Sequence, residues 1–387
     1  MYKKEDVSLK IELVTMHRVC NYGSALQAYA TQSVMERLGH SVEILDYYPE
    51  RMHFSGMLKR LKNKKEIFEN NPVLCFIAQC IIFPSYIKRF YIFRTFMKKH
   101  FKISSVRYND LGSIQSSPPA ADVYCTGSDQ VWNSEWSEQV DRAFYLDFGS
   151  PITPRISYAA SFGKAQLDDN EFNEIKLLLS KYKYISVREA SGIDILNKME
   201  LPGELVLDPT LLPDKSQWSK LASDRYRDKK YILLYNLGRE PELYDIAYAY
   251  AKKLRLPLYS VSYNLHEFVK PGRLLFCPKV CDWLSLIKNA QCVFSDSLHA
   301  TAFSINFNTD FYVYYPGRFS TRLASLVELT GLKNRVLQKG KVPENENIDF
   351  SEANAAVQRE RKLSFEFLTK ALEAQQDGKD YITCPTS

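Results

Sequence analysis

The sequence predicts an α/β protein made of two doubly wound halves that face each other across a central cleft, followed by a C-terminal helix. The chain opens with a buried strand (residues 11–16), an amphipathic helix ending near Leu38 and a second strand (residues 42–45), which together form a β-α-β unit. The same alternation restarts at residue 231. The length of 387 residues exceeds the ~250–300 residues at which single cores stop growing, which favours two domains.

The order of predicted elements divides the chain into three parts. We expect an N-terminal α/β domain in residues 1–210 with a helical insertion in residues 50–105, a C-terminal α/β domain in residues 211–345, and a linker with a C-terminal helix in residues 346–387. After the insertion, strands are expected at residues 121–126, 155–159, 184–187 and 205–210. In the second half they are expected at residues 231–235, 258–261, 292–295 and 311–315. Ligands of such folds bind at the carboxyl ends of the strands and at domain interfaces.

Composition excludes several classes of protein. A hydrophobic content of 45% and a charged content of 25% are ordinary for a soluble globular protein. The eight Cys show no paired zinc-ligand spacing, so we expect reduced thiols and no metal site. Gly23 is the one glycine in the first strand-to-helix turn, which argues against a nicotinamide or flavin domain. No apolar stretch of signal-peptide type follows Met1, so we expect a cytoplasmic location.

Residues 57–102 differ in charge from the rest of the chain. They hold eleven Lys and Arg against two Glu, whereas the whole chain carries a net charge of +6. Residues 73–83 are apolar except for Gln79, and this run is far shorter than the ~20 residues that span a bilayer. The segment is predicted either to lie on an anionic membrane surface as a basic, apolar helix pair or to pack on its own domain. Nucleic acid is disfavoured, because no recognisable binding motif accompanies the charge.

Two loops that follow predicted strands carry candidate ligand-binding groups. Residues 127–133 concentrate polar side chains and a Trp directly after the strand at 121–126, which is typical of a ligand loop. Arg188 stands at the carboxyl end of another strand, where a guanidinium can clamp a phosphate or carboxylate in a bidentate manner. The alternative for Arg188 is an ion pair with Glu189 or another neighbour.

Residues 292–305 form the most informative stretch of the second half. A short apolar strand breaks at Ser295-Asp296-Ser297 and continues as a helix of small residues. The first turn of a helix carries partial positive charge and favours anions. His299 lies in that turn and can both give and take a proton near neutral pH. The alternative is a capped core helix with a half-buried His.

Six motifs, taken in order, resemble those of the polysaccharide pyruvyl transferase family. The resemblance covers the chain from about Ile11 to Arg335. The motifs are Asn21-Tyr22-Gly23-Ser24, Gly127-Ser128-Asp129-Gln130-Val131-Trp132, Ser157-Tyr158-Ala159-Ala160-Ser161-Phe162-Gly163, Ser186-Val187-Arg188-Glu189, Leu207-Asp208-Pro209-Thr210 and Ser295-Asp296-Ser297-Leu298-His299.

This resemblance implies a fold of the GT-B glycosyltransferase kind, with two Rossmann-like domains, and an activity. The enolpyruvyl group of phosphoenolpyruvate would pass to a sugar, usually as a ketal bridging two hydroxyls, with no other cofactor and no metal. Arg188 and the Leu298-His299 pair match family positions that hold phosphoenolpyruvate. Ser297 stands where the family has an Arg, so the missing charge would come from Arg322 or Arg318, or Ser297 and helix N–H groups would suffice.

The resemblance also implies roles for individual residues. His299 would protonate the methylene carbon of the donor, and Asp129 would orient or deprotonate the acceptor hydroxyl. Tyr22 and Trp132 would pack on the sugar. The expected acceptor-binding residues are Asn21, Tyr22, Gly23, Ser128, Asp129, Gln130, Trp132 and Ser161.

The expected acceptor is a sugar of a surface polysaccharide or its lipid-linked precursor, met at the inner face of the cytoplasmic membrane. Two alternatives remain. One is a GT-B glycosyltransferase that uses a nucleotide sugar, and the other is a non-catalytic sugar-binding or membrane-docked scaffold, against which the presence of both Arg188 and His299 argues.

Overall fold

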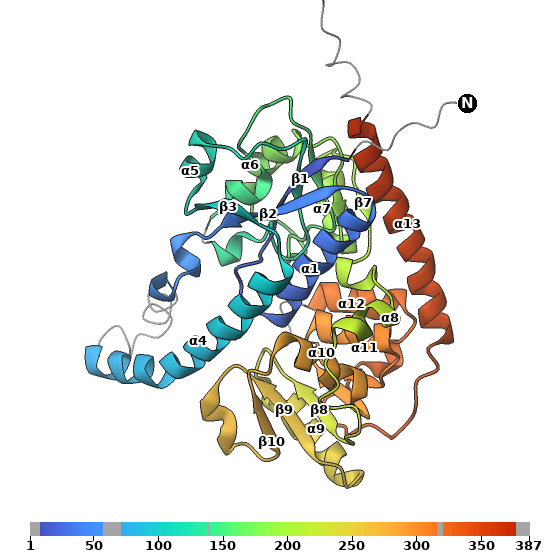
Figure 1. Ribbon diagram of the computed structural model, residues 1–387. Helices are drawn as coiled ribbons and strands as arrows, with labels where there is room; N and C mark the ends of the chain where they lie inside the picture. The colour runs from blue at the N-terminus through green and yellow to red at the C-terminus, as the bar shows by residue number, and fades with distance from the viewer. Residues whose placement is uncertain (1–7, 57–70, 138, 316–319, 377–387) are drawn as a thin grey trace, which may run out of the picture.

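Two parallel sheets of five strands each, one per half of the chain, form the framework of the protein (Figure 1). The computed structural model describes residues 8–56, 71–137, 139–315 and 320–376. Most strands are buried along nearly their whole length, which explains why they read as continuous apolar runs in the sequence. The predicted fold class is confirmed.

The first sheet has the strand order β3-β2-β1-β4-β5. Its strands are β1 (Lys10–Val14), β2 (Ser41–Tyr47), β3 (Ile103–Tyr108), β4 (Val123–Thr126) and β5 (Arg155–Ser157). The helices of this half are α1 (Tyr22–Arg37), α4 (Pro72–His100), α5 (Leu111–Ser116), α6 (Asp169–Leu179) and α7 (Ala190–Lys198), with 3-10 turns at Glu50–Met52, Ser134–Trp136 and Arg142–Tyr145. A short parallel pair, β6 (Ser186–Val187) and β7 (Glu204–Leu205), continues beside β5 through single bridges.

The second sheet repeats this arrangement with the order β10-β9-β8-β11-β12. Its strands are β8 (Ile232–Tyr235), β9 (Leu258–Ser262), β10 (Arg273–Phe276), β11 (Cys292–Ser295) and β12 (Phe311–Val313). Its helices are α8 (Lys215–Leu221), α9 (Pro241–Lys253), α10 (Val280–Asn289), α11 (Leu298–Phe307) and α12 (Ser320–Leu329), with 3-10 turns at Leu265–Val269 and Lys333–Arg335. In both sheets the strand order reverses beside the first strand, which creates a crevice at the carboxyl ends.

The segment between the two halves differs from the sequence prediction. A strand was expected at residues 205–210, but β7 ends at Leu205 and a 3-10 turn occupies Pro209–Leu211. The reason is local, because Asp208 accepts hydrogen bonds from both the backbone N–H and the hydroxyl of Thr210. A side chain that caps a turn in this way competes with strand pairing.

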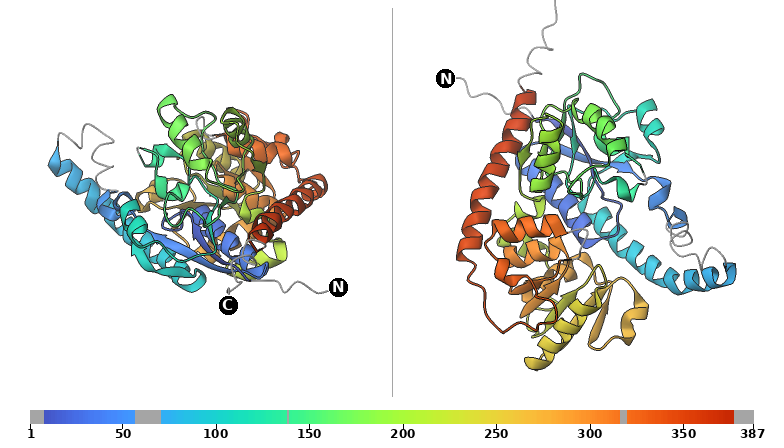
Figure 2. Two further views of the ribbon diagram at one scale, coloured as in Figure 1. Left: turned by 90° about the horizontal axis from the view of Figure 1, so that it is seen from above. Right: turned by 180° about the vertical axis from the view of Figure 1, so that it is seen from behind.

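The C-terminal helix α13 (Ser351–Gln376) runs along both halves (Figures 1 and 2). It packs on α11 and α12 of the second half. It also contacts the first half, where the Ser364 hydroxyl accepts a hydrogen bond from the Leu207 N–H at 2.9 Å and Lys183 donates to the Ala374 carbonyl at 3.2 Å. The helix therefore helps to fix the two halves relative to each other.

Helix α4 is a single helix of 29 residues whose N-terminal half projects from the body (Figures 1 and 2). The sequence prediction ended its apolar run at residue 83 and judged the run too short to span a membrane. Residues Val73–His100 are in fact long and apolar enough to do so by length and composition, which is weak evidence by itself. Towards its C-terminus the helix is packed, with Phe93 buried against the Tyr22 ring at 5.2 Å. The basic residues 59–65 lie outside the described residues.

One buried carboxyl makes folding pH-dependent. Glu12 lies in β1, is 0% exposed, and neither of its carboxylate oxygens has a hydrogen-bond partner in the described part of the chain. Burial, followed by the nearby charge of Glu43, raises its pKa from 4.5 to about 8, although Lys10 opposes the shift. The fold thus prefers the protonated acid, so this contribution to stability is present below about pH 4.5 and is lost as the pH rises through about 8.

Glu12→Gln should therefore flatten the pH dependence of stability. Between the unfolded and folded pKa values of Glu12, wild type should lose roughly 1.4 kcal/mol of unfolding free energy per pH unit relative to the variant. Urea unfolding at pH 5, 7 and 8.5 measures this, with Glu373→Gln on the exposed face of α13 as the control. Parallel curves for wild type and Glu12→Gln would contradict the assignment.

Candidate functional site

The candidate site lies at the seam where the carboxyl ends of the two sheets meet. Ser128 and Asp129 follow β4, the strand beside the reversal in the first sheet, and His299 follows β11, the matching strand of the second sheet. The two halves are in close contact here, because a Cβ atom built on Gly23 would lie 2.1 Å from His299 Nδ1. Only a glycine at the start of α1 leaves room for the imidazole of the opposite half.

Arg188 lies at the centre of this seam with its side chain 1% exposed. Its Nη1 donates to Asp208 Oδ2 at 2.7 Å and to Ser128 Oγ at 3.3 Å. Its Nη2 donates to Asp129 Oδ1 at 3.3 Å, and its Nε lies 3.8 Å from Glu189 Oε2. One buried cation is thus surrounded by three carboxylates. The structure shows Arg188 in ion pairs, which is the alternative that the sequence left open. We call Arg188 and these three carboxylates the seam cluster.

The ionisation states within the seam cluster depend on one another. Burial opposes the charge of Arg188, but Asp208, Asp129 and Glu189 outweigh it and raise the pKa of the guanidinium. Burial likewise opposes ionisation of Asp129, yet Arg188 and then His299 hold the pKa of this carboxyl below its usual value. For Glu189, burial exceeds the effect of Arg188 and raises the pKa. Glu189 is therefore the carboxylate of the cluster that binds a proton most readily.

His299 approaches this cluster from the second half. Its Nε2 lies 3.6 Å from Asp208 Oδ2 and has no hydrogen-bond partner within the described residues. Burial opposes the charge of Asp208, but His299 first and Arg188 next outweigh it and keep the pKa of this carboxyl far below its usual value. The arrangement thus holds the unpartnered Nε2 of a buried imidazole beside a carboxylate.

Arg322, from the first turn of α12, adds a second cation to the site. Across the described residues it makes no hydrogen bond and no ion pair, and its Nε is inaccessible to solvent and unpartnered. Burial, and then repulsion by Arg188, lower its pKa to about 10, against the attraction of Glu189 and Asp129. An anionic ligand would relieve both effects. Arg318, the other candidate replacement for the family Arg, lies outside the described residues.

Some residues predicted to bind the acceptor instead have structural contacts. Asn21 caps α1 by accepting the Gly23 N–H at 2.8 Å. The Tyr22 ring is buried, stacks on Trp283 at 5.0 Å and donates its hydroxyl to the Pro278 carbonyl. Trp132 is 1% exposed and donates from its indole to a backbone carbonyl. The structure therefore offers no free face of Tyr22 or Trp132 for a sugar, in contrast to the expectation.

The remaining predicted residues lie around the seam. Ser24 donates to Asp129 Oδ2 at 2.5 Å, so α1 holds the aspartate from the side opposite Arg188. Gln130 accepts from Asn133 at 2.7 Å, and the fully buried Ser161 accepts the Gly163 N–H at 3.1 Å.

In the second half, Ser297 caps α11 and Leu298 is half-buried in the core. The cap of Ser297 is a long one, with 3.4 Å between its Oγ and the Ala300 N–H. The sequence reasoning assigned no role to Asp208, although it lies in one of the six motifs; only the folded chain shows its contact with His299.

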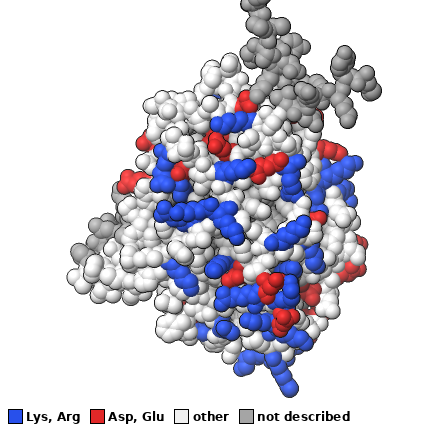
Figure 3. Space-filling model, viewed as in Figure 1, with Lys and Arg blue, Asp and Glu red and all other residues white. Residues whose placement is uncertain are grey.

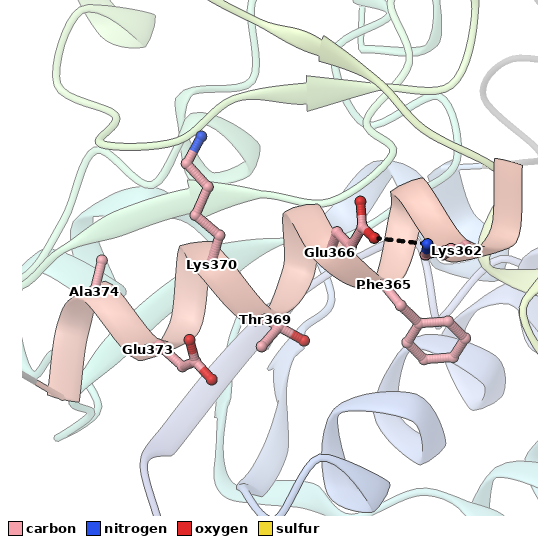
Figure 4. A pocket seen from close by; sticks show the side chains of 7 residues that line it. All are labelled: Lys362, Phe365, Glu366, Thr369, Lys370, Glu373 and Ala374. Atoms are coloured by element: carbon pink, nitrogen blue, oxygen red, sulfur yellow. Dashed lines mark ion pairs between the residues drawn. The ribbon is translucent and has the colours of Figure 1, made fainter.

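Surface hollows are found away from the seam. One lies on α13 and is lined by side chains of that helix alone (Figure 4). Its charges are partly satisfied along the helix, since Lys362 lies 3.8 Å from Glu366. A second hollow lies between α4 and the β10–α10 segment. Within the described residues no group of three His, Cys, Asp or Glu side chains is arranged to hold a metal ion.

The two sheets and their connections define an α/β fold of the GT-B kind. Among solved structures, a proposed UDP-N-acetylglucosamine 2-epimerase from Listeria monocytogenes is similar, with a TM-score of 0.50 and 9% identity over 92% of this chain and 91% of that chain. A UDP-glucosyltransferase from Polygonum tinctorium has a TM-score of 0.46 and 10% identity over 95% and 98% of the two chains. At such identities the likeness concerns the fold alone.

The family follows from the sequence. A family model described as polysaccharide pyruvyl transferase matches residues 21–317, which is most of the chain. A search of curated proteins gives no match. The chain belongs to the polysaccharide pyruvyl transferase family.

Gly23→Ala tests the close approach of the two halves. Alanine is favoured over glycine within helices by up to about 1 kcal/mol, so the substitution should not harm α1 itself. The new methyl would displace His299, and we expect at least a tenfold loss of activity with unfolding free energy changed by less than ~2 kcal/mol. Gly112→Ala, at the matching second position of α5, is the control because its Cβ would meet its nearest neighbour at 3.4 Å. Equal activity of Gly23→Ala and Gly112→Ala would contradict the close approach of His299 to residue 23.

Proposed function

We propose that this enzyme transfers the enolpyruvyl group of phosphoenolpyruvate to a sugar of a surface polysaccharide or of its lipid-linked precursor and releases phosphate. The observation that carries the proposal is the meeting of His299, from one half, with the seam cluster of the other. A buried acid, paired carboxylates and an unpaired Arg322 together suit a small dianionic or trianionic donor that must be protonated on carbon.

The proposed reaction has two stages. His299 donates its proton to the methylene carbon C3, and the electron-poor C2 is attacked by one acceptor hydroxyl, whose proton passes to a base such as Asp129 and from there restores the proton on His299. The C2–O bond to phosphate then breaks, the second hydroxyl attacks C2, and its proton leaves with phosphate. Two hydroxyl protons thus balance one new C–H bond and one protonated phosphate, and neither a metal nor another cofactor enters the scheme.

The site geometry suggests a division of roles between the two arginines. Arg188 has its donors directed at Asp208, Asp129 and Ser128, so its role would be to hold these groups in place. Arg322 has free donors and would bind the carboxylate or phosphate of the donor. It would thereby replace the family Arg whose position is occupied by Ser297.

The direct test of the proposal is phosphate release from phosphoenolpyruvate in the presence of candidate acceptor sugars. His299→Ala should lower kcat by ~10²–10⁴, which corresponds to about 2.7–5.5 kcal/mol of barrier, because a positioned general acid is worth that much. The variant should still bind the donor. His266→Ala, an exposed His on the turn Leu265–Val269, is the control. Wild-type turnover by His299→Ala would exclude it as the acid.

Replacing each arginine separates binding from stability. Arg322→Ala should raise the KM for phosphoenolpyruvate about tenfold to a hundredfold, because a charge-assisted contact is lost, and should leave stability unchanged or slightly higher. Arg188→Ala would leave three buried carboxylates without their cation, so we expect a loss of roughly 3–5 kcal/mol in unfolding free energy. Steady-state kinetics and urea unfolding measure both. An unchanged KM for Arg322→Ala would show that helix N–H groups suffice.

The lipid-linked acceptor implies a place for the enzyme at an anionic membrane surface. Helix α4 supports this, since its projecting half exposes large apolar side chains, among them Val73 at 67% and Phe76 at 65% exposure. In Figure 3 the projecting lobe at the left is uncharged on the visible face. The packed half of the helix supplies cations such as Lys98 and Lys99.

Apolar substitutions in α4 test this placement. Phe76→Ser combined with Ile77→Ser should lower binding to anionic vesicles at least tenfold, because two exposed apolar side chains no longer enter the interface. The control is Ile152→Ser with Leu177→Ser, which removes apolar side chains elsewhere on the surface that are more exposed, at 84% and 66%, than Phe76 and Ile77, at 65% and 48%. Binding should also weaken with salt. Vesicle flotation measures it, and equal binding by both double variants would show that α4 does not mediate docking.

A further inference from the structure

A groove beside the C-terminal half of α4, away from the seam, is lined by positively charged side chains. It lies between α4 and the segment that connects β10 to α10. Four cations line it, namely Lys88, Arg225, Arg273 and Lys279, against the single acid Asp282. All four cationic residues are exposed, whereas Asp282 is buried. In Figure 3, Lys and Arg outnumber acidic residues over the lower half of the visible face, opposite in character to the uncharged lobe.

The hydrogen bonds of the groove leave its charge unbalanced. The Asp282 carboxylate is already occupied, because it accepts from the Ser223 hydroxyl at 2.7 Å and from Arg225 at 3.2 Å. Lys88 donates to a backbone carbonyl, which carries no net charge. Arg273 and Lys279 form no ion pair with any described residue. An anion in the groove would therefore meet cations whose charge is not neutralised by the protein.

The groove is connected to the candidate site by one residue. Pro278 lines the groove, and its carbonyl accepts the Tyr22 hydroxyl at 2.7 Å. The next residue, Gly23, contacts His299. On the other side, Tyr91 and Ile92 of α4 line the groove, and the exposed apolar face of the helix begins there and extends away from the body. The groove thus lies between the exposed apolar face of α4 and the seam.

We infer that this groove binds the phosphate or diphosphate of a lipid-linked acceptor, a group esterified to a long hydrocarbon on one side and to a sugar on the other. The hydrocarbon would lie in the bilayer beside the apolar face of α4, the phosphate would contact Lys88, Arg273 and Lys279, and the sugar would extend from the groove towards the seam. The inference rests on the proposed function, because it assigns a place to that reaction's acceptor. It predicts recognition of a carrier phosphate rather than of bulk anionic lipid.

Vesicles of phosphatidylcholine that contain a few mole per cent of a polyprenyl phosphate are the probe. They are compared with vesicles of equal surface charge made with phosphatidylglycerol. We expect wild type to prefer the polyprenyl phosphate vesicles about tenfold, as one charge-assisted phosphate contact predicts. Arg273→Gln combined with Lys279→Gln should abolish that preference. Arg359→Gln with Lys362→Gln, two exposed cations on α13 at 67% and 80% side-chain exposure, is the matched control and should retain it.

Equal binding of wild type to both vesicles would mean that the groove contributes only general surface charge, and a preference that persists in Arg273→Gln/Lys279→Gln would place the phosphate elsewhere; either overturns the inference. Competition by free pyrophosphate at the concentration of the lipid would also overturn it, because the hydrocarbon would then play no part. Phosphate release from phosphoenolpyruvate with a free sugar should be unchanged in the double variant. If wild type releases no phosphate in that assay but still prefers the polyprenyl phosphate vesicles, the proposed chemistry is refuted, whereas the phosphate site in the groove is still supported.

Discussion

The buried charge of Arg188 is the interaction on which the seam depends. Three carboxylates, Asp129, Asp208 and Glu189, converge where water is excluded, and isolated buried carboxylates cost several kcal/mol each. One guanidinium with donors pointing in fixed directions lets two of them remain ionised. The position of Arg188 directly after β6, beside the carboxyl ends of β4 and β5, places its charge where the first sheet opens towards the second half.

The other features of the site follow from that neutralisation. His299 and then Arg188 keep the pKa of Asp208 far below its usual value, so Asp208 remains a carboxylate 3.6 Å from the imidazole. Gly23 leaves the space that the imidazole needs. Since Arg188 is occupied by its own carboxylates, we propose that Arg322, which forms no ion pair with any described residue, is the cation that binds the donor. Helix α4 completes the arrangement, because Arg89 on it donates to the carbonyl of Cys20 just before α1, and its far end exposes the apolar face.

The sequence predicted much of the fold and part of the site. Continuous apolar runs bounded by turns correctly indicated four of the five strands in each sheet. The edge strands β3 and β10 were missed, because both are only partly buried and carry no continuous apolar run. The resemblance brought Asp129, Arg188 and His299 together. It did not reveal the pairing of Arg188 with Asp208, because the partner of a buried charge is decided by packing between distant segments. Nor did it distinguish a core role for Trp132 from a sugar platform, since an aromatic in a polar loop suits both. The apolar run of α4 was ended at residue 83, where Pro84 and Ser85 follow, whereas the helix itself continues through Pro84 to His100.

The central claim is that His299 protonates the methylene carbon of phosphoenolpyruvate at this seam. Turnover in D₂O, followed by NMR of the sugar product, tests it most directly. We expect a pyruvate ketal whose methyl group carries one deuterium from solvent, and we expect this product to be absent with His299→Ala. A product that keeps an unsaturated methylene group, or consumption of a nucleotide sugar while phosphoenolpyruvate stays intact, would contradict it.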